Sequence, residues 1–506
     1  MPAVGPPDPR ARVRTSERLT VCAVTLAAAV LAWALSARLG ATVDSIRYLY
    51  AARSLVAGDG FVDTAGQPFV QYAPLYPLLL AGLSTLGIDL PSAARLVSAL
   101  SLGASAAVGG VWVRRITGDG RAIAVGAAAA VLVAPALMTR YALSEPLFLA
   151  LLLAAGLATS AAISARSAPL AALAGILTGL AGVTRWAGLP LLAAAVYVAY
   201  AWSGGWRARW SAAVWFATTA AVIAGAALVH TQSVSGAVLP ATPEAGRPVS
   251  AVAREAAGGI ARFVTPDRTP GPVQFVVVAA VVALVGWSVA RIGRSRSAEW
   301  WRLASVPFVF GGIYVATNVL SALFANIGSL DERMLTPAQS LFGVGIAALV
   351  WTATRQTASA WSPDRRRRLA RLATTGPLVL LVGLAGGALA RDGVELQPAT
   401  WPTPGLESPP LQRAVAAYGD DVVFSDAPFA TAWATARPVQ PWPVEGEDLD
   451  VVRDAAAARP TVVVWTGGEE NDDHATFEAV TDGCVLTVLH RDDTGTISRV
   501  ESCTPS

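Results

Sequence analysis

The sequence predicts an α-helical membrane protein that crosses the bilayer about eleven times and carries a small α/β unit at its C-terminal end. Hydrophobic residues make up 54% of the 506 residues and charged residues only 14%, whereas soluble proteins have about 25% charged residues. A chain this apolar cannot cover its own surface with polar groups, so lipid must cover part of it. Its apolar residues also gather in runs that approach the roughly 20 residues needed to span a bilayer core as a helix.

This composition excludes a soluble enzyme, a disordered protein and a small disulfide-stapled domain. The formal net charge is only +3, and all 38 basic residues are arginines. A charge so close to zero gives no indication of a nucleic-acid partner. The expected partner of the chain as a whole is the lipid bilayer.

The predicted spans follow one another along most of the chain. They cover residues 19–39, 92–113, 121–138, 145–164, 168–183, 187–202, 211–230, 272–290, 304–324, 337–354 and 374–390. A shorter apolar stretch, 73–87, contains Pro74 and Pro77 and predicts a re-entrant or interfacial helix. The first run has an alternative interpretation as a cleaved signal peptide, because Ala34-Leu35-Ser36-Ala37 resembles a cleavage site. We favour a span, since the run continues directly into the loop with the most functional candidates.

The distribution of arginine predicts the orientation. If the N-terminus is cytoplasmic, the inner segments hold 20 arginines and five acidic residues, and the rest of the chain holds 18 arginines and 30 acidic residues. Arginine and lysine accumulate on the cytoplasmic side of membrane proteins. An odd number of spans then puts the C-terminus outside. We expect a protein of the plasma membrane with an extracytoplasmic C-terminus.

This orientation divides the chain into four parts. Residues 1–18 form a basic cytoplasmic tail, and residues 19–391 form the transmembrane domain with long outer loops at 40–91 and 231–271. Residues 392–412 are rich in proline and indicate a linker. Residues 413–506 form the extracytoplasmic α/β domain.

The C-terminal unit has a recognisable strand pattern. Residues 422–424 and 461–465 are short runs of β-branched and aromatic residues that predict buried strands, and residues 484–491 and 496–503 predict a hairpin around Asp493-Thr494-Gly495. Cys484 and Cys503 lie almost symmetrically about that turn. In an oxidising compartment they would form a cross-strand disulfide; the alternative is two free thiols.

Five polar clusters mark the candidate site, because polar residues at the edge of a membrane are costly and usually functional. Each cluster could instead have a purely structural role: as an ion pair, as an aromatic anchor at the membrane interface, or as an acid that is favourable at a helix N-terminus. For Arg185 the specific alternative is an ion pair with an acid such as Glu145. The first cluster is Asp44, Arg47, Tyr48 and Tyr50; the second is Gln71, Tyr72 and Tyr76; the third is Arg140, Tyr141, Ser144 and Glu145; the fourth is Thr184, Arg185 and Trp186; and the fifth is Asp331, Glu332 and Arg333.

The residue types in these clusters point to particular chemistry. Asp44 can act as a general base, and burial would raise its pKa toward a useful value; Arg47 and Tyr48 share its helix face. Tyr72 and Tyr76 offer flat rings on which a sugar can stack. Arg185 and Arg333 suit a phosphate, because a guanidinium binds phosphate through two parallel hydrogen bonds. Asp331 would orient Arg333 or pair with it.

All five clusters fall on the predicted outer side of the membrane. A transporter would more often carry its polar groups at the midplane, on broken helices. A site at the outer interface suits a substrate whose head lies outside while its lipid tail stays in the bilayer.

The order of these motifs resembles the polytopic GT-C glycosyltransferases, which include protein O-mannosyltransferases and aminoarabinose transferases. The resemblance covers roughly residues 20–350. It is carried by Asp44 with Tyr48, Gly58-Asp59-Gly60, Tyr72-Ala73-Pro74-Leu75-Tyr76-Pro77, Leu143-Ser144-Glu145-Pro146, Thr184-Arg185 and Glu332-Arg333-Met334-Leu335-Thr336-Pro337.

The resemblance implies an inverting transfer of a sugar from a polyprenyl-phosphate donor to an extracytoplasmic acceptor. That acceptor would be an envelope glycan, a glycolipid or a protein. Asp44 would correspond to the loop aspartate that takes the acceptor proton, and Arg185 and Arg333 would hold the lipid phosphate. Protein O-mannosyltransferases have an Asp-Glu pair in this loop, whereas Asp44 is followed by Ser45, so the acceptor stays open.

No cofactor is demanded by the sequence. A divalent metal is compatible with the family but is not indicated, because no paired carboxylates or histidines occur at fixed spacing; Asp59 and Asp63 are interpreted first as turn residues. Two other functions compete with the enzyme: a lipid or solute transporter or flippase, which predicts inverted repeats and charge inside the membrane, and a membrane-anchored envelope assembly protein that acts through the C-terminal domain.

Overall fold

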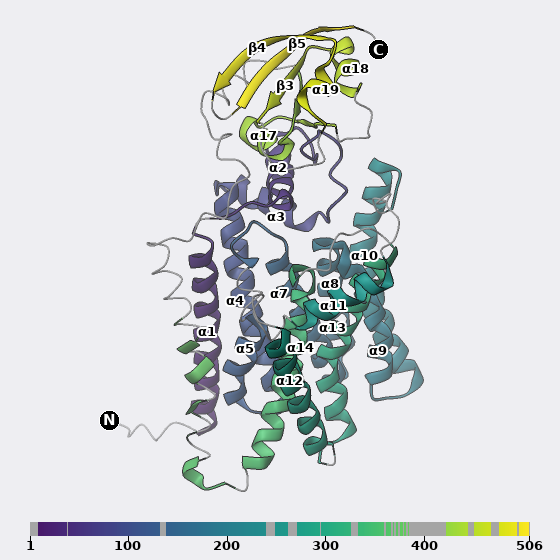
Figure 1. The fold of residues 1–506 in the computed structure, drawn as a ribbon. Helices are drawn as coiled ribbons and strands as arrows, with labels where there is room; N and C mark the ends of the chain where they lie inside the picture. Colours follow the sequence, from purple (N-terminus) through teal and green to yellow (C-terminus); the bar gives the residue numbers. More distant parts are fainter. Residues whose placement is uncertain are drawn as a thin grey trace, which may run out of the picture.

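The computed structural model describes most of the helical region and most of the C-terminal sheet (Figure 1). The described residues are 9–37, 39–131, 138–238, 248–261, 271–293, 295–324, 332–358, 361–365, 368, 371–372, 375–377, 379–380, 383, 421–443, 450–466, 475–492 and 495–504.

Long helices form a bundle, and short apolar helices complete it. Seven described helices are long and apolar enough to cross a membrane, over the ranges Thr15–Leu35, Leu90–Thr117, Glu145–Ala165, Trp206–Ser235, Pro272–Ile292, Ala298–Phe324 and Arg333–Ala358. They belong to α1 (Pro9–Leu35), α4 (Leu90–Thr117), α7 (Glu145–Ala165), α10 (Trp206–Ser235), α12 (Gly271–Ile292), α13 (Ala298–Phe324) and α14 (Glu332–Ala358). The shorter apolar elements are α3 (Leu75–Thr85), η1 (Gly120–Ala122) with α5 (Ile123–Val131), α8 (Ala168–Thr184), and η2 (Trp186–Ala193) with α9 (Ala194–Ala201).

The prediction of a polytopic helical membrane protein is confirmed. Each predicted run up to residue 354 overlaps one or two of these helices, although residues 132–137 of the run 121–138 lie outside the described residues. The stretch 73–87 contains the short helix α3. The last predicted span, 374–390, and the predicted linker, 392–412, lie largely or wholly outside the described residues. Two helices fill parts of the predicted loops: α2 (Val43–Ala57) in the first and α11 (Val249–Ala261) in the second. Val252 of α11 is buried against Ala322 of α13, which explains why this stretch is not an irregular loop.

The bundle packs through small residues. Its core is rich in alanine, with larger side chains such as Trp112, Phe148 and Phe310 filling the spaces between helices. Gly175 shows how close the helices come: a Cβ at this position would collide with the backbone of Phe216, so only glycine lets α8 lie against α10. Small residues at such positions are typical of helix association in membranes.

A five-stranded sheet with neighbouring helices forms the C-terminal part. The strands are β1 (Val422–Ser425), β2 (Gln440–Pro441), β3 (Thr461–Trp465), β4 (Cys484–Asp492) and β5 (Gly495–Cys503), in the order β2-β1-β3-β5-β4. β1 is parallel to β2 and β3, and β5 is antiparallel to β3 and β4. The strands predicted near residues 422 and 461 and the predicted hairpin are all present. A disulfide joins Cys484 to Cys503, which are directly opposite each other in the hairpin.

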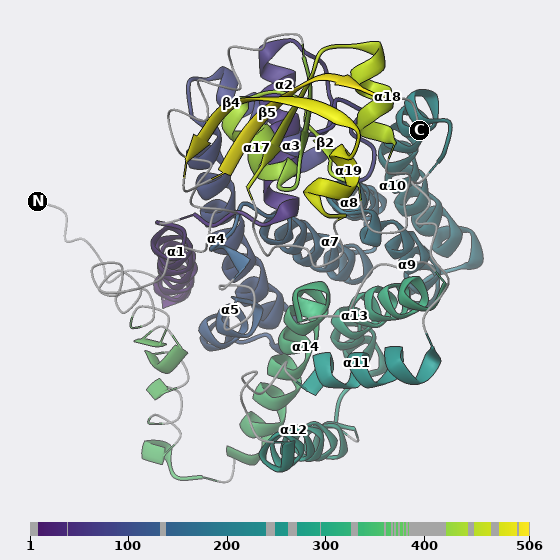
Figure 2. The same cartoon turned by 45° about the horizontal axis from the view of Figure 1, so that its top comes forward.

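Helices cover both faces of the sheet. Val452 of α18 (Val451–Ala458) and Val480 of α19 (Phe477–Thr481) share a core with Phe424 and Val463 on one face. Ala432 of α17 (Pro428–Thr435) shares a second core with strand residues of the other face. This sheet lies above α2 and α3 at one end of the bundle in Figure 1, and in front of them in Figure 2.

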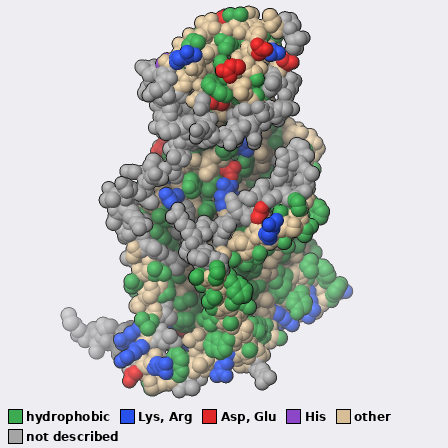
Figure 3. Space-filling model, in the orientation of Figure 1, with side chains coloured by type: hydrophobic (Ala, Val, Ile, Leu, Met, Phe, Trp, Pro, Cys, Tyr) green, Lys and Arg blue, Asp and Glu red, His purple; other side chains and the backbone are tan. Residues whose placement is uncertain are grey.

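The two ends of the molecule differ in charge. On the face drawn in Figure 3, arginine side chains gather at the end of the bundle far from the sheet, below a belt of hydrophobic side chains. Arg114 and Arg115 at the end of α4, Arg291 at the end of α12 and Arg355 at the end of α14 belong to that distant end. The belt has the composition of a lipid-facing surface.

Candidate functional site

Asp44 is presented by the first turn of α2. Thr42 caps this helix, and its side chain accepts a hydrogen bond from the backbone N–H of Ser45. An acidic residue in the first turn of a helix is favoured by the helix dipole, so local structure alone supports Asp44 there. Ser45 is buried and its hydroxyl lies 3.1 Å from that of Thr42. Position 45 therefore belongs to the helix cap and does not face an open site.

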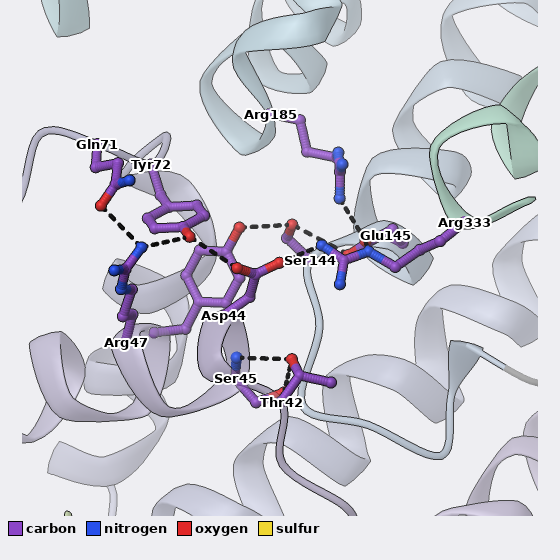
Figure 4. Close-up of polar contacts among 11 residues, drawn as sticks. Thr42, Asp44, Ser45, Arg47, Gln71, Tyr72, Ser144, Glu145, Arg185 and Arg333 are labelled. Carbon is purple, nitrogen blue, oxygen red and sulfur yellow. Dashed lines mark hydrogen bonds and ion pairs between the residues drawn. The ribbon is translucent and has the colours of Figure 1, made fainter. Parts of the chain in front are cut away.

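Charged residues from three helix ends lie on one side of Asp44 (Figure 4). Glu145 is the first residue of α7, Arg185 follows the last residue of α8, and Arg333 lies in the first turn of α14. Glu145 Oε1 lies 2.6 Å from a terminal guanidinium nitrogen of Arg185 and 2.7 Å from Nε of Arg333. Arg333 also forms an ion pair with Asp44. Glu145 and Arg333 thus connect Arg185 to Asp44.

These four groups carry two positive and two negative charges and form one continuous network in the order Arg185, Glu145, Arg333, Asp44. The Glu145 side chain is only 2% exposed, whereas the side chains of Asp44 and Arg333 are 19% and 27% exposed. Removing one member of a buried ion pair usually costs about 3–5 kcal/mol, because it leaves the partner charge without compensation. Glu145, in the middle of the network, is therefore its structural anchor, whereas the side chains of Arg185, Arg333 and Asp44 remain 14%, 27% and 19% exposed.

Arg47, Gln71 and Tyr72 from the first outer loop lie on the other side of Asp44. The Tyr72 hydroxyl donates a hydrogen bond of 2.7 Å to Asp44 Oδ1. Arg47, one turn after Asp44, donates to the Tyr72 hydroxyl at 2.8 Å and to Gln71 Oε1 at 2.9 Å. The Arg47 guanidinium also lies over the Phe429 ring, 4.6 Å from its centroid. Phe429 belongs to α17, so the C-terminal sheet region reaches this side of the site.

Tyr48 and Tyr76 lie beneath this arrangement and do not form an open stacking surface. Tyr48 is 3% exposed and Tyr76 is fully buried. Their rings meet edge to face at 5.2 Å, and the Tyr48 hydroxyl is hydrogen-bonded to Ser144 at 3.1 Å. The expectation that Tyr76 stacks on a sugar is corrected: its ring packs inside the protein because α3 turns it toward the core under α2.

The electrostatic setting of Asp44 also differs from the expectation. Burial alone would raise the pKa of Asp44, but Arg333 and the hydrogen bond from Tyr72 outweigh burial and lower it. Asp44 is therefore ionised and paired in this state. Burial, followed by the charge of Asp44, raises the pKa of Tyr72 to about 12, so Tyr72 keeps the proton that it donates.

Each of the five sequence clusters contributes a side chain to this site. The structure brings together Asp44, Arg47, Tyr48, Tyr72, Glu145, Arg185 and Arg333. Asp331, the remaining candidate, lies outside the described residues. The sequence interpretation missed Phe429, which stands in a segment without a motif; no signal in the sequence would have singled it out.

Among the described residues, no group of three or more histidine, cysteine, aspartate and glutamate side chains could hold a metal ion. Asp63 has a turn role, since its carboxylate accepts hydrogen bonds from the backbone N–H groups of Ala65 and Gln67.

The fold of this chain is similar to that of solved structures, although its sequence is not similar to known families. No protein-family model matches the sequence. No curated protein sequence matches it either. ArnT from Cupriavidus metallidurans bound to undecaprenyl phosphate superposes with a TM-score of 0.61 and 14% identity, over 95% of this chain and 98% of ArnT. Apo ArnT gives a TM-score of 0.60 at the same identity, over 96% and 98%. The archaeal oligosaccharyltransferase AglB from Archaeoglobus fulgidus is more distant, with a TM-score of 0.49 and 11% identity over 88% of this chain and 69% of AglB.

The chain therefore has the fold of ArnT. The family resemblance inferred from the sequence is confirmed at the level of the fold. The match extends over nearly the whole chain of ArnT, so it includes the C-terminal sheet region as well as the helices.

Proposed function

We propose that this protein is a membrane glycosyltransferase that moves a sugar from a polyprenyl-phosphate donor to an acceptor, with inversion at the anomeric carbon. The observation that carries the proposal is the position of Asp44 between two arginines from the helix ends and a hydrogen-bonded tyrosine from the outer loop. The ArnT fold supports the proposal, and the ArnT structure that superposes on this chain contains undecaprenyl phosphate.

Arg185 and Arg333 are the proposed phosphate-binding residues. Both lie at helix ends rather than in the middle of a span, which suits a phosphate at the membrane surface whose prenyl tail extends along the bundle. Arginine binds phosphate through two parallel hydrogen bonds. During transfer, their positive charge would stabilise the negative charge that develops on the departing polyprenyl phosphate.

Asp44 is the proposed base, and the donor itself would make it more basic. Arg333 is shared between Asp44 and Glu145. A donor phosphate competes for Arg333, and movement of Arg333 toward the phosphate leaves Asp44 hydrogen-bonded to Tyr72 without its cation. A partly buried carboxylate without a cation binds protons more tightly, so Asp44 becomes a better acceptor for a hydroxyl proton.

The proposed reaction then balances without a cofactor. The acceptor oxygen gives its proton to Asp44 and attacks the anomeric carbon. The bond from that carbon to the phosphate oxygen breaks, and polyprenyl phosphate leaves with the electron pair. Asp44 later returns the proton to solvent.

We infer that the site faces the extracytoplasmic side of the plasma membrane, with the N-terminus in the cytoplasm. Arginines concentrate at the opposite end of the bundle (Figure 3). In membrane proteins, arginine and lysine accumulate on the cytoplasmic side. The Cys484–Cys503 disulfide supports an oxidising compartment for the sheet region. The acceptor would therefore be an extracytoplasmic glycan, glycolipid or protein.

The test is sugar transfer by the purified protein in nanodiscs, with a panel of radiolabelled polyprenyl-phosphate sugars and a crude envelope acceptor. We expect transfer by the wild type and a loss of about 10²-fold or more in Asp44→Asn, the effect typical of a missing general base. Wild-type-like melting of Asp44→Asn in the same nanodiscs is the control for folding. Equal transfer by both proteins would remove Asp44 as the base. No transfer with any donor would favour the transporter or assembly function.

A further inference from the structure

The helix that carries Asp44 is also part of the core of the C-terminal sheet region. Tyr50, six residues after Asp44 on α2, is buried in one hydrophobic cluster with Val423 of β1 and with Val462 and Val464 of β3. Ala432 of α17 belongs to the same cluster. The sheet face therefore rests on two helices, α17 from its own segment and α2 from the first outer loop (Figure 1).

A second set of contacts joins α2 to the end of α17. Arg53 donates one hydrogen bond to the carbonyl of Ala432 and one to that of Trp433, both at 2.8 Å. Its guanidinium also lies 4.7 Å from the centroid of the Trp433 ring. Carbonyls in the last turn of a helix lack partners within the helix, so Arg53 supplies bonds that α17 cannot make for itself.

The outer loop is fixed to the sheet beside α2. The backbone N–H of Val439, just before β2, donates to the carbonyl of Thr64 at 2.7 Å, and the Gln440 side chain donates to the carbonyl of Ala65 at 3.1 Å. These contacts join residues about 375 positions apart in the chain. The sheet region and the first outer loop are thus built as one unit.

One chain of contacts leads from this unit to the carboxylate of Asp44. Phe429 at the start of α17 covers the Arg47 guanidinium, Arg47 donates to the Tyr72 hydroxyl, and Tyr72 donates to Asp44. An arginine side chain has many rotamers, and holding it in one of them costs conformational entropy. The Phe429 ring limits this freedom through a cation–π contact and so keeps Arg47 directed at Tyr72.

We propose that Phe429 is a positioning residue of the site: through Arg47 and Tyr72, the C-terminal sheet region holds Asp44 on the side opposite the phosphate-binding arginines. The inference rests on the proposed glycosyltransferase function and assigns the sheet region a part in it. It predicts that loss of the Phe429 ring impairs the Asp44 side of the reaction and leaves donor binding unchanged.

The test compares Phe429→Ala with Phe477→Ala in the full-length protein. Phe477 is also partly buried, but it packs against Trp442 and Trp465 in the cluster on the other face of the sheet. Both variants remove one phenyl ring from the same region, so a general loss of stability would affect them alike. Phe429→Tyr keeps the ring and serves as the rescue variant.

We expect Phe429→Ala to lower kcat about three- to ten-fold and to leave the KM for the donor unchanged. The acid limb of the pH profile of kcat/KM should move to higher pH. Phe429→Tyr should restore kcat, and Phe477→Ala should behave like the wild type. In an Arg47→Ala background, Phe429→Ala should have no further effect, because the ring acts through Arg47. Equal loss in Phe429→Ala and Phe477→Ala, or a wild-type kcat in Phe429→Ala, would overturn the proposal.

Hydrogen exchange of the α2 backbone separates this inference from the proposed function, since it needs no transfer. We expect faster exchange in the first turns of α2 in Phe429→Ala and no change there in Phe477→Ala. If the wild type transfers no sugar, the glycosyltransferase proposal fails, and the exchange result alone decides whether Phe429 positions α2. Unchanged exchange in Phe429→Ala would then overturn the positioning role.

Discussion

The two sides of Asp44 are built from different parts of the molecule and by different interactions. On one side, the ends of α7, α8 and α14 supply Glu145, Arg185 and Arg333, which are joined by ion pairs. On the other side, the first outer loop and α17 supply Tyr72, Arg47 and Phe429, which are joined by hydrogen bonds and ring contacts. The first side thus offers two guanidinium groups to a charged ligand, whereas the guanidinium of Arg47 on the second side is held in place by hydrogen bonds and a ring contact. The difference suggests that one side binds the donor phosphate and the other orients the base.

Among the variants that compare the two sides, the largest effect is expected when the shape of a cation changes on the ion-paired side. Arg333→Lys keeps the charge, but an ammonium group cannot reach both Asp44 and Glu145 as the guanidinium does through separate nitrogens. We expect the KM for the polyprenyl-phosphate donor to rise about ten-fold or more, because lysine binds phosphate as a point charge without the paired geometry of arginine.

The matched control is Arg47→Lys on the other side of Asp44. It should leave the KM for the donor near the wild-type value, since Arg47 bonds to Gln71 and Tyr72 and not to the charged network. Steady-state kinetics with varied donor measure both variants. The division into two sides would be wrong if Arg47→Lys raised the donor KM as much as Arg333→Lys.

A smaller effect is expected from Tyr72→Phe, which removes one hydrogen bond to Asp44 and keeps the ring. A hydrogen bond to a charged group contributes about 1.5–3 kcal/mol. Because the Asp44 side chain is partly exposed, the lower limit applies and kcat/KM should fall about ten-fold. The same bond helps to lower the pKa of Asp44 below its usual 3.8. The acid limb of kcat/KM should therefore move upward in pH in the variant, as a pH series from 3 to 7 would detect.

The sign of this pH effect follows from linkage. A carboxylate whose pKa is lowered by folding contributes stability above its unfolded pKa and loses that contribution as the pH falls through its folded pKa. Tyr72→Phe makes the pKa of Asp44 in the folded protein less depressed. The contribution of Asp44 to the stability of the fold is therefore smaller, and it is lost at a higher pH. A downward shift of the acid limb would show that Tyr72 does not act on the ionised form of Asp44.

Most of the fold could be predicted from the sequence because its signals are local. Apolar runs define the spans, and alternation around Asp493-Thr494-Gly495 defines the hairpin. The helix α11 was not predicted, because its apolar side is buried only by packing against α13. Short strands such as β2, with two residues, have no pattern of their own and form only where β1 offers an edge.

The composition of the site could be predicted, but its pairings could not. Polar residues at helix ends stand out against apolar surroundings, and the alternative that Arg185 pairs with Glu145 is what the structure contains. Arg333 pairs with Asp44 across 289 residues, a choice that depends on how α14 packs beside α7. Phe429 could not be found because a phenylalanine in a soluble segment is usually part of a core.

Donor binding tests the central claim most directly, because it separates the two proposed roles before any chemistry. The binding of undecaprenyl phosphate to the wild type, Asp44→Asn, Arg333→Gln and Arg185→Gln can be measured by native mass spectrometry in detergent. We predict binding to Asp44→Asn that is at least as tight as to the wild type, because the neutral side chain no longer competes for Arg333. Each arginine variant should bind at least about ten-fold more weakly, a loss of about 1.4 kcal/mol. Equal binding by all four proteins, or weaker binding by Asp44→Asn than by the arginine variants, would contradict the account.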